Sequence, residues 1–499
     1  MSAFSRRKLL LAAGTALAAG AAGGVFGFRA LHRRPKHVIL VVVDALRADR
    51  LGCYGGPRET LQGRISLTPG FDDIASQGTL FERCIAPSSW TLMSVPAILG
   101  SRFPFVEGDS FNMSFMPPRA ATLAQALRSS GYSTHAVVAN AALSGSVAAG
   151  VSVSRGFDTY EVPLPDMIPN PLFAKHIGGE KVYDRCTGAS LLFRLATQHL
   201  ERAHTAGRPA FIYVHPMETH EPYTAIGRFL ADCAAPRAHV PDFMLCEAMR
   251  DVAVYEKRTV LAEKDLPLLA RAAAVYDAAV RTVDMAVSSL ADYLDSHDAG
   301  AETLLAVTAD HGEEFGEHNW FAHAQTLYTE SIHVPLVFRG AGVPSGIRCG
   351  DLVSSIDIAP TLLHALGLAI PPSMVGVPRP LAENVAADGR GMISSLTKPC
   401  TDQAIEEKEY SITDPTGMKL IRREFAGAKA AQGVLSELYD ARHDPCENSN
   451  LAASRPAAVA ALEKRLQFVR NANVSGPGQK IVLDEKAREQ LKALGYIGH

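Results

Sequence analysis

Short apolar runs that end abruptly in polar residues recur along this chain. Residues 37–43 are almost entirely β-branched or leucine and are followed by Asp44. Residues 304–307 form a similar run, shortly before Asp310 and His311. Apolar runs without polar alternation are typical of strands that are buried on both faces of a parallel sheet. The pattern therefore predicts two central strands, each with polar side chains at its carboxyl end.

Other apolar runs predict strands at 79–85, 133–138, 209–214 and 334–338. Residues with helical spacing, several bounded by glycine, predict helices at 68–78, 93–99, 122–131, 191–206, 265–297 and 355–367. Alternation of strands and helices indicates an α/β domain with a large, mostly parallel central sheet flanked by helices.

The pattern changes near residue 385. Short strands at 408–412, 418–422 and 435–439, followed by a helix at 456–470, predict a small α+β subdomain with an antiparallel sheet. The 499 residues suffice for one large and one smaller unit. We therefore divide the chain into an N-terminal segment (1–36), an α/β domain (37–385) and a C-terminal subdomain (386–499).

The N-terminal segment has the features of an export signal. Arg6 and Arg7 precede an Ala- and Gly-rich apolar run at 9–28, which resembles a bacterial twin-arginine signal. The run is also long enough to span a bilayer uncleaved, although its Ala and Gly content makes this less favourable. We expect a periplasmic or extracytoplasmic protein, with membrane association through the N-terminus if this segment is retained.

Composition and charge exclude one class of partner. The net charge of −3 and the absence of a basic run after residue 36 give no sign of nucleic-acid binding. The eight cysteines are scattered without close pairs, so disulfides in an exported chain and incidental thiols are both compatible with the sequence. No large apolar face argues for a stable dimer.

The ends of the two central strands supply candidate metal ligands. Ligands bind at the carboxyl ends of strands in open α/β sheets. Asp44, Asp310 and His311 are of the types that hold a divalent cation such as zinc or manganese. The alternatives are a polar loop at 308–323 and an Asp44 that caps the next turn.

Hydroxyl residues precede the helix predicted at 93–99. Ser88, Ser89 and Thr91 lie in this position. A hydroxyl here can cap the helix, or it can act as a nucleophile whose anionic intermediate is held by free backbone N–H groups.

Several of these segments together resemble the sulfatase family. The similar motifs occur in order at 43–55, 88–94, 215–223, 308–337, 355–361, 437–445 and 491–496. The resemblance implies the alkaline phosphatase-like α/β fold and a divalent-metal site for anionic esters.

The chain departs from the family pattern at the nucleophile. Sulfatases that cleave sulfate esters use formylglycine, which is made from Cys or Ser in a Cys/Ser-x-Pro-x-Arg motif. Here Thr91 falls at that position, with Met93 and Val95 in place of the Pro and Arg. No formylglycine is therefore expected. Ala45 also replaces the second residue of the family's opening Asp pair.

The remaining set of Asp44, Thr91, Asp310 and His311 is similar to the single-metal site of phosphoethanolamine transferases in the same superfamily. The resemblance implies one divalent ion (zinc, manganese or calcium) bound by Asp44, Asp310 and His311, with Thr91 as the nucleophile. It also implies that His220 contacts the ester anion, unless it is a solvent-facing loop residue.

The resemblance places His323 near the leaving group, as a general acid or charge stabiliser. Four further residues have two interpretations each. His215 is functional or structural, Glu314 and His318 support the metal or are solvated, and Arg47 contacts the anion or is exposed.

We expect hydrolysis of small-molecule, glycan or lipid esters, with phosphate favoured over sulfate. A sulfate on threonine has no elimination route, whereas a phosphothreonine can be released by a second attack on phosphorus. The alternatives are a phospho-group transferase and a catalytically degenerate binding protein.

Overall fold

The computed structural model describes residues 34–472, except for 57–58, 61–62, 65, 106–119, 145–152, 164–187, 222, 227–228, 230–265, 382–388 and 400–404. The predicted export segment and the predicted boundary near residue 385 lie outside the described residues. Within them, Cys53, Cys84, Cys349 and Cys446 are free thiols. None of the described helices combines the length and the apolar character needed to cross a membrane.

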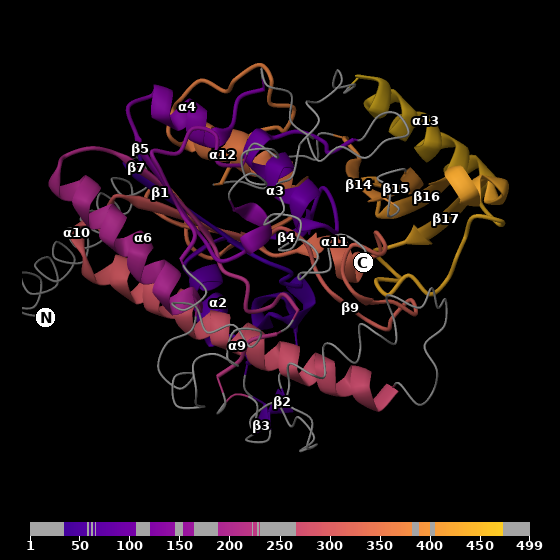
Figure 1. Cartoon of the computed structure of the whole chain (residues 1–499), viewed down its shortest axis with the longest axis horizontal. Coiled ribbons are helices and arrows are strands. Elements are labelled where there is room, and N and C mark those ends of the chain that lie inside the picture. The colour runs from indigo at the N-terminus through magenta and orange to yellow at the C-terminus, as the bar shows by residue number, and fades with distance from the viewer. Residues whose placement is uncertain are drawn as a thin grey trace, which may run out of the picture.

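A nine-stranded sheet forms the centre of the molecule (Figure 1). Its order is β11-β4-β12-β8-β1-β7-β5-β6, and β13 also pairs with β4. The strands are β1 (His37–Val43), β4 (Gly78–Ile85), β5 (Ser133–Val138), β6 (Thr159–Glu161), β7 (Ala210–His215), β8 (Thr303–Ala309), β11 (His333–Val334), β12 (Leu336–Gly340) and β13 (Ile347–Ser354). The predicted α/β class with a large sheet is thus confirmed.

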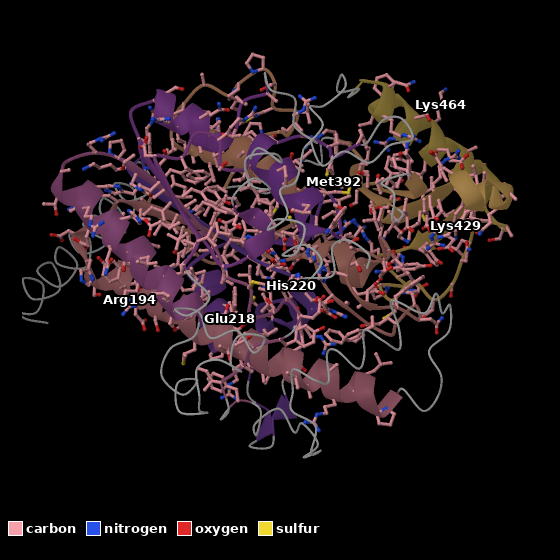
Figure 2. All side chains as sticks on the ribbon, viewed as in Figure 1. Arg194, Glu218, His220, Met392, Lys429 and Lys464 are labelled. Carbon is pink, nitrogen blue, oxygen red and sulfur yellow. The ribbon has the colours of Figure 1, made fainter. Side chains whose placement is uncertain are left out.

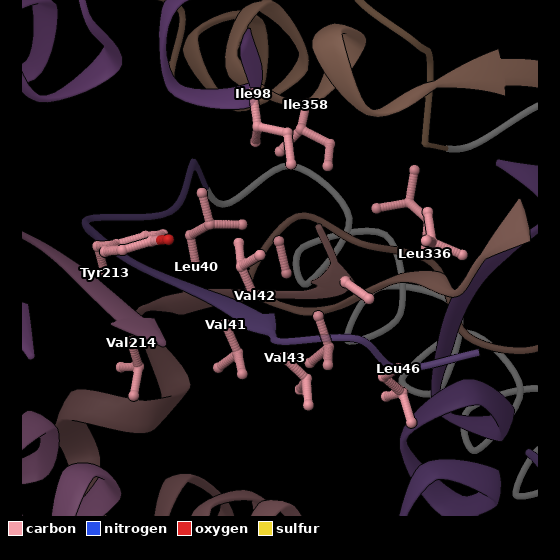
Figure 3. Close-up of a cluster of buried hydrophobic side chains, with 14 of the residues drawn as sticks. Leu40, Val41, Val42, Val43, Leu46, Ile98, Tyr213, Val214, Leu336 and Ile358 are labelled. Atoms are coloured by element: carbon pink, nitrogen blue, oxygen red, sulfur yellow. The ribbon is translucent and has the colours of Figure 1, made fainter. Parts of the chain in front are cut away.

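Strand β1 lies in the interior of the sheet, and all seven of its residues are buried. It pairs in parallel with β7 on one side and β8 on the other. Its side chains alternate between the two faces: Leu40 and Val42 point toward Ile98 and Ile358, whereas Val41 and Val43 point the other way (Figure 3). Burial on both faces explains why the strand reads as a continuous apolar run.

Helices cover both faces of the sheet (Figure 1). One layer contains α2 (Pro69–Ser76), α6 (Gly188–Thr205) and α9 (Leu266–Ser296). The other contains α3 (Thr91–Gly100), α4 (Leu123–Ser129) and α12 (Ile358–Ala365), which follows a short 3-10 turn at Ser355–Asp357.

The sheet is more mixed than the sequence indicates. Five strand pairs are parallel, but β12 runs antiparallel to β8 and β4, and β11 runs antiparallel to β4. The single strand predicted at 334–338 is divided at Pro335 into β11 and β12. Proline has no N–H group to contribute to the ladder, which accounts for the break.

The C-terminal sheet has four antiparallel strands in sequential order: β14 (Met392–Pro399), β15 (Ile405–Thr413), β16 (Met418–Phe425) and β17 (Val434–Asp440). Helix α13 (Pro456–Ala472) packs on one face, where Leu420 and Leu438 meet Leu462 and Leu466. The sequence did not predict β14, because its Ser, Thr and Lys residues hide the strand pattern.

The first turn of α2 is capped from a distance. The N-cap residue, Thr68, makes no side-chain cap hydrogen bond, and its hydroxyl instead accepts from the Gly52 N–H at 2.8 Å. The Asp284 carboxylate on α9 accepts from the N–H groups of Gly70 at 3.1 Å and Phe71 at 2.7 Å.

We expect Asp284→Ala to lower the free energy of unfolding by about 1–2 kcal/mol, because it leaves two helix N–H groups without an acceptor. Denaturant unfolding of the purified protein measures this change. The control is Asp292→Ala at an exposed position of the same helix, which should change the value by less than about 0.5 kcal/mol. Equal effects of the two variants would contradict the capping role.

Candidate active site

The carboxyl ends of four adjacent strands lie side by side, and each strand carries a polar side chain at or just after its end. In spatial order the strands are β8, β1, β7 and β5. Val43 of β1 is in register with Ala309 of β8, so Asp44 and Asp310 leave the sheet side by side. His215 ends β7, and Asn140 follows β5 by two residues. The strand order thus assembles residues that are far apart in the chain.

Asp44, Asp310, His311 and Thr91 form a compact buried cluster. The His311 Nε2 atom lies 3.6 Å from Asp44 Oδ1, 3.5 Å from Asp310 Oδ2 and 3.0 Å from Thr91 Oγ1. Thr91 Oγ1 is 3.4 Å from Asp44 Oδ1. Tetrahedral zinc with bonds of about 2.0–2.1 Å has ligand–ligand separations of about 3.3 Å. These four separations are close to those between the ligands of one small cation, and the ligand atoms of Asp44, Asp310 and His311 all lie within 4.8 Å of one another.

The hydrogen bonding of these residues also fits a cation. Asp310 Oδ1 accepts from the N–H groups of Ala45 and His311, whereas the buried Oδ2 has no hydrogen-bond partner. A buried carboxylate oxygen without a partner is costly, and a bound cation would satisfy it. His311 Nδ1 lies 2.8 Å from the Gly312 carbonyl, which can only accept. Nδ1 therefore carries the proton, and the Nε2 lone pair faces the carboxylates.

The charge states agree with this assignment. Burial lowers the pKa of His311 to about 3, which keeps the imidazole neutral and able to bind a metal. Burial, together with the negative charge of Asp44, raises the pKa of Asp310 to about 7. Asp44 and Asp310 thus bring two buried carboxylates into one cluster, where a divalent cation would favour the charged form of both.

Asp44 is held in place by residues at the ends of β7 and β5. Its Oδ2 atom accepts from Asn140 Nδ2 at 2.6 Å and lies 3.0 Å from His215 Nε2. His215 Nδ1 in turn contacts the Tyr213 hydroxyl at 2.8 Å. Burial opposes ionisation of Asp44, but the histidines His220 and His215 outweigh it and hold its pKa well below the usual value. His215 therefore orients Asp44.

We expect Asn140→Ala to weaken divalent-metal affinity by about 10- to 100-fold, the usual effect of removing a group that orients a ligand. Competition with a fluorescent chelator measures the affinity. Asn448→Ala, at an exposed position, is the control. Unchanged affinity in the Asn140 variant would show that Asp44 is held without this hydrogen bond.

Thr91 is the first residue of α3, which begins two residues before the predicted start. The N-cap residue is Trp90, whose side chain makes no cap hydrogen bond. The alternative in which Thr91 caps the helix is therefore wrong. Ser94, one turn further along, donates to the Asp310 carbonyl at 2.5 Å and fixes the helix to the end of β8.

His220 and His323 lie beside the cluster. The His323 ring is 4.6 Å from that of His311 and 4.6 Å from that of His220, measured between ring centres. His220 is fully buried near the middle of the molecule, so the solvent-facing alternative is wrong (Figure 2). Its Nδ1 atom lies 2.5 Å from the Glu221 carbonyl.

Two buried carboxylates hold His323. Its Nδ1 atom is 3.2 Å from Glu221 Oε2 and 3.4 Å from Glu313 Oε1. Burial would lower the pKa of His323, but the two carboxylates outweigh it and raise the pKa well above the usual value. Neither glutamate is predicted as a site residue from the sequence, although Glu221 directly follows His220 and Glu313 follows His311 by two residues.

Glu314, His318 and Arg47 have other partners. Glu314 accepts from the Thr326 hydroxyl, and His318 Nδ1 lies 2.6 Å from Glu330 Oε1. Arg47 is buried and pairs with Asp49 and Glu317, so the expectation of an exposed arginine is wrong. Its guanidinium also donates to the Glu313 carbonyl at 2.9 Å, which fixes the loop after β8.

Ala45 adopts a left-handed conformation, with φ at 57°. Its N–H donates to Asp310 Oδ1, and its carbonyl accepts from the Tyr276 hydroxyl at 2.7 Å. The chain therefore turns sharply after Asp44, at a position where residues other than glycine are disfavoured.

Comparisons with known proteins agree with the fold. The profile described as Sulfatase matches residues 36–368, and the profile described as N-sulphoglucosamine sulphohydrolase, C-terminal, matches residues 316–472. Arylsulfatase K of Mus musculus is 27% identical over 217 residues, covering 40% of this chain and 35% of the relative. The match thus spans about a third of that relative's length.

Iduronate 2-sulfatase of Homo sapiens is 25% identical over 393 residues, covering 67% of this chain and 70% of the relative. The phosphonate monoester hydrolase of Agrobacterium radiobacter has the same fold, with a TM-score of 0.66 at 20% identity, covering 91% of this chain and 99% of that one. The Sulfatase profile matches more than half of this chain. The chain therefore belongs to the sulfatase family.

Proposed function

We propose that this protein is a metal-dependent hydrolase of anionic esters in which Thr91 is the nucleophile. The observation that carries the proposal is the position of the Thr91 hydroxyl, 3.0 Å from His311 Nε2 and 3.4 Å from Asp44 Oδ1, at the start of α3. The N–H groups in the first turn of a helix favour a bound anion, so the ester would be attracted to the nucleophile.

Asp44, Asp310 and His311 would hold the cation. When bound, a divalent metal lowers the pKa of a nearby hydroxyl and neutralises the charge of the ester. We propose zinc or manganese rather than calcium, because calcium takes six to eight oxygen ligands, whereas these residues offer a compact set that includes a nitrogen.

The residues of the chain then divide the work of ester cleavage. The deprotonated Thr91 oxygen attacks phosphorus, forming the Thr91 O–P bond as the bond to the leaving-group oxygen breaks. The leaving oxygen takes a proton from the His323 imidazolium, which Glu221 and Glu313 favour by their negative charge. His220 contacts the transferred anion. Water then gives a proton to the neutral His323 imidazole and attacks the phosphothreonine. The bond between phosphorus and the Thr91 oxygen breaks, which releases phosphate and regenerates both the deprotonated Thr91 oxygen and the His323 imidazolium.

A phosphate ester suits this nucleophile better than a sulfate ester. Both bonds in the proposed cycle form and break at phosphorus, so no elimination from the enzyme is needed. Similar proteins support anionic esters in general, because they include both an iduronate 2-sulfatase and a phosphonate monoester hydrolase. Small molecules, glycans and lipids are all compatible carriers of the ester.

The test is an assay of the purified protein, loaded in turn with zinc, manganese and calcium, on nitrophenyl phosphate, phosphodiester, phosphonate and sulfate substrates. We expect turnover of a phosphorus ester with zinc or manganese. Mass spectrometry of acid-quenched enzyme should find a phosphate on the peptide that contains Thr91. A metal-loaded protein without turnover on any ester class would instead favour a binding protein that has lost catalysis.

We further propose that the protein acts outside the cytoplasm, because Arg6 and Arg7 precede an apolar run of the twin-arginine type. In a bacterium with this export system, replacing both arginines with lysine should leave the protein in the cytoplasmic fraction. Fractionation with an antibody against the C-terminal part measures the distribution. An unchanged distribution would contradict this route of export.

A further inference from the structure

The segment 323–329, which begins with His323, is held by hydrogen bonds to the C-terminal subdomain. Three of its residues contact three carboxylates: the Leu327 N–H donates to Glu409 Oε1 at 2.7 Å, the Tyr328 hydroxyl to Glu437 Oε2 at 2.7 Å, and the Thr329 N–H to Glu447 Oε2 at 2.8 Å. Each carboxylate comes from a part of the chain more than 80 residues away. Consecutive residues are thus fixed one after another.

One face of the C-terminal sheet makes this contact. Alternate residues of β16 face opposite ways, and Lys419, Ile421 and Arg423 share the face toward segment 323–329. Arg423 Nε donates to Glu409 Oε2 at 2.7 Å, and Lys419 Nζ lies 2.7 Å from Glu447 Oε1. Ile421 packs with Tyr328 and Tyr439. Arg423 and Lys419 hold the carboxylates of Glu409 and Glu447 in the orientation in which these carboxylates accept from the segment.

Segment 323–329 needs external support because of its backbone. Ala322 and Ala324, on either side of His323, have φ values of 71° and 60°. A side chain with a Cβ atom disfavours this left-handed conformation. The backbone conformation around His323 therefore depends on contacts with other parts of the chain. The Ala324 N–H donates to the Ser89 carbonyl at 2.9 Å, and the Leu327 N–H donates to Glu409.

We infer that Glu409 is a positioning residue for His323. It acts through the backbone at Leu327 and is fully buried, with one oxygen on the segment and the other on Arg423. The inference rests on the proposed function, in which His323 gives a proton to the leaving oxygen. The C-terminal subdomain thus has an indirect part in the reaction, because its residue Glu409 positions His323 and does not itself react.

The test compares two aryl esters of the anion that the wild type hydrolyses fastest, one with dinitrophenol and one with phenol as the leaving group. Phenol needs a proton to leave, whereas dinitrophenol does not. We expect Glu409→Ala to lower kcat about 10- to 100-fold on the phenyl ester but less than about threefold on the dinitrophenyl ester. Glu409→Gln, which keeps an oxygen for the Leu327 N–H, should recover most of the loss.

The matched control is Glu424→Ala. Glu424 lies on the same sheet and accepts from Arg422 at 3.0 Å and Arg470 at 2.8 Å, both within the C-terminal subdomain. Its loss should lower thermal stability without changing the ratio of the two rates. Combining Glu409→Ala with His323→Ala should be no slower on the phenyl ester than His323→Ala alone, because both changes remove the same proton transfer.

Equal losses of kcat on both esters in Glu409→Ala, or a rate ratio that matches Glu424→Ala, would overturn the inference and leave the role of His323 intact. If His323→Ala itself leaves the rate ratio unchanged, the acid role fails and the inference fails with it. Hydrogen exchange of a peptide covering 324–332 gives a readout besides activity. Exchange should be faster in Glu409→Ala, but not in Glu409→Gln or Glu424→Ala.

Discussion

Replacing Thr91 with alanine should lower kcat by about 10⁴-fold or more on every ester that the wild type turns over, because the substitution removes the proposed nucleophile. The fold should survive, since Thr91 is not the N-cap of α3 and alanine is a good helix former. Steady-state kinetics measures the loss, and the mass of the acid-quenched enzyme should no longer rise by one phosphate.

Thr91→Ser is the informative control, because it keeps a hydroxyl in the same place. It should retain measurable turnover and a trapped phosphoryl group, with the modified peptide still containing residue 91. If Thr91→Ala keeps turnover within about tenfold of the wild type, then another group performs the attack, and the position of the hydroxyl in the cluster is not that of a nucleophile.

The central strands and the proximity of Asp44 to Asp310 and His311 could be predicted because their signals are local. An unbroken apolar run such as 37–43 indicates burial on both faces, and an acidic residue directly after it lies at a strand end. Strand β14 could not be predicted in this way, because Ser394, Ser395 and Thr397 are buried yet polar. Their burial depends on partners that appear only in the folded chain, such as the Ala86 carbonyl that accepts from the Ser394 hydroxyl.

The support of the site could not be predicted either. Asn140 contacts Asp44 only because β5 lies next to β7, and β7 next to β1, an order that no local pattern specifies. Glu221 and Glu313 stand close to predicted residues, yet an acidic loop residue is usually solvated. Only the fold brings both carboxylates to His323 and buries them.

Replacing Asp310 with asparagine should have opposite effects on activity and on the stability of the metal-free protein. Turnover and metal affinity should fall, the former by about 10³-fold or more, because one of the three proposed cation ligands loses its charge. The metal-free variant should nevertheless unfold at a higher temperature than the metal-free wild type. The substitution removes a buried negative charge beside Asp44, and the new amide can donate to His311 Nε2, which lies 3.5 Å from Asp310 Oδ2.

Thermal unfolding of both proteins, with a chelator and with added zinc, tests this reversal. The wild type should gain stability with zinc, by about 2.7 kcal/mol at 100 times the Kd, while the variant should gain little. Asp292→Asn at an exposed position should leave both curves unchanged. If the metal-free variant is instead less stable than the metal-free wild type, then the two carboxylates are not held together against their repulsion, and the cluster is a structural network rather than a cation site. A gain in stability on removal of the Asp310 charge is the result expected of a cation site and not of a structural network.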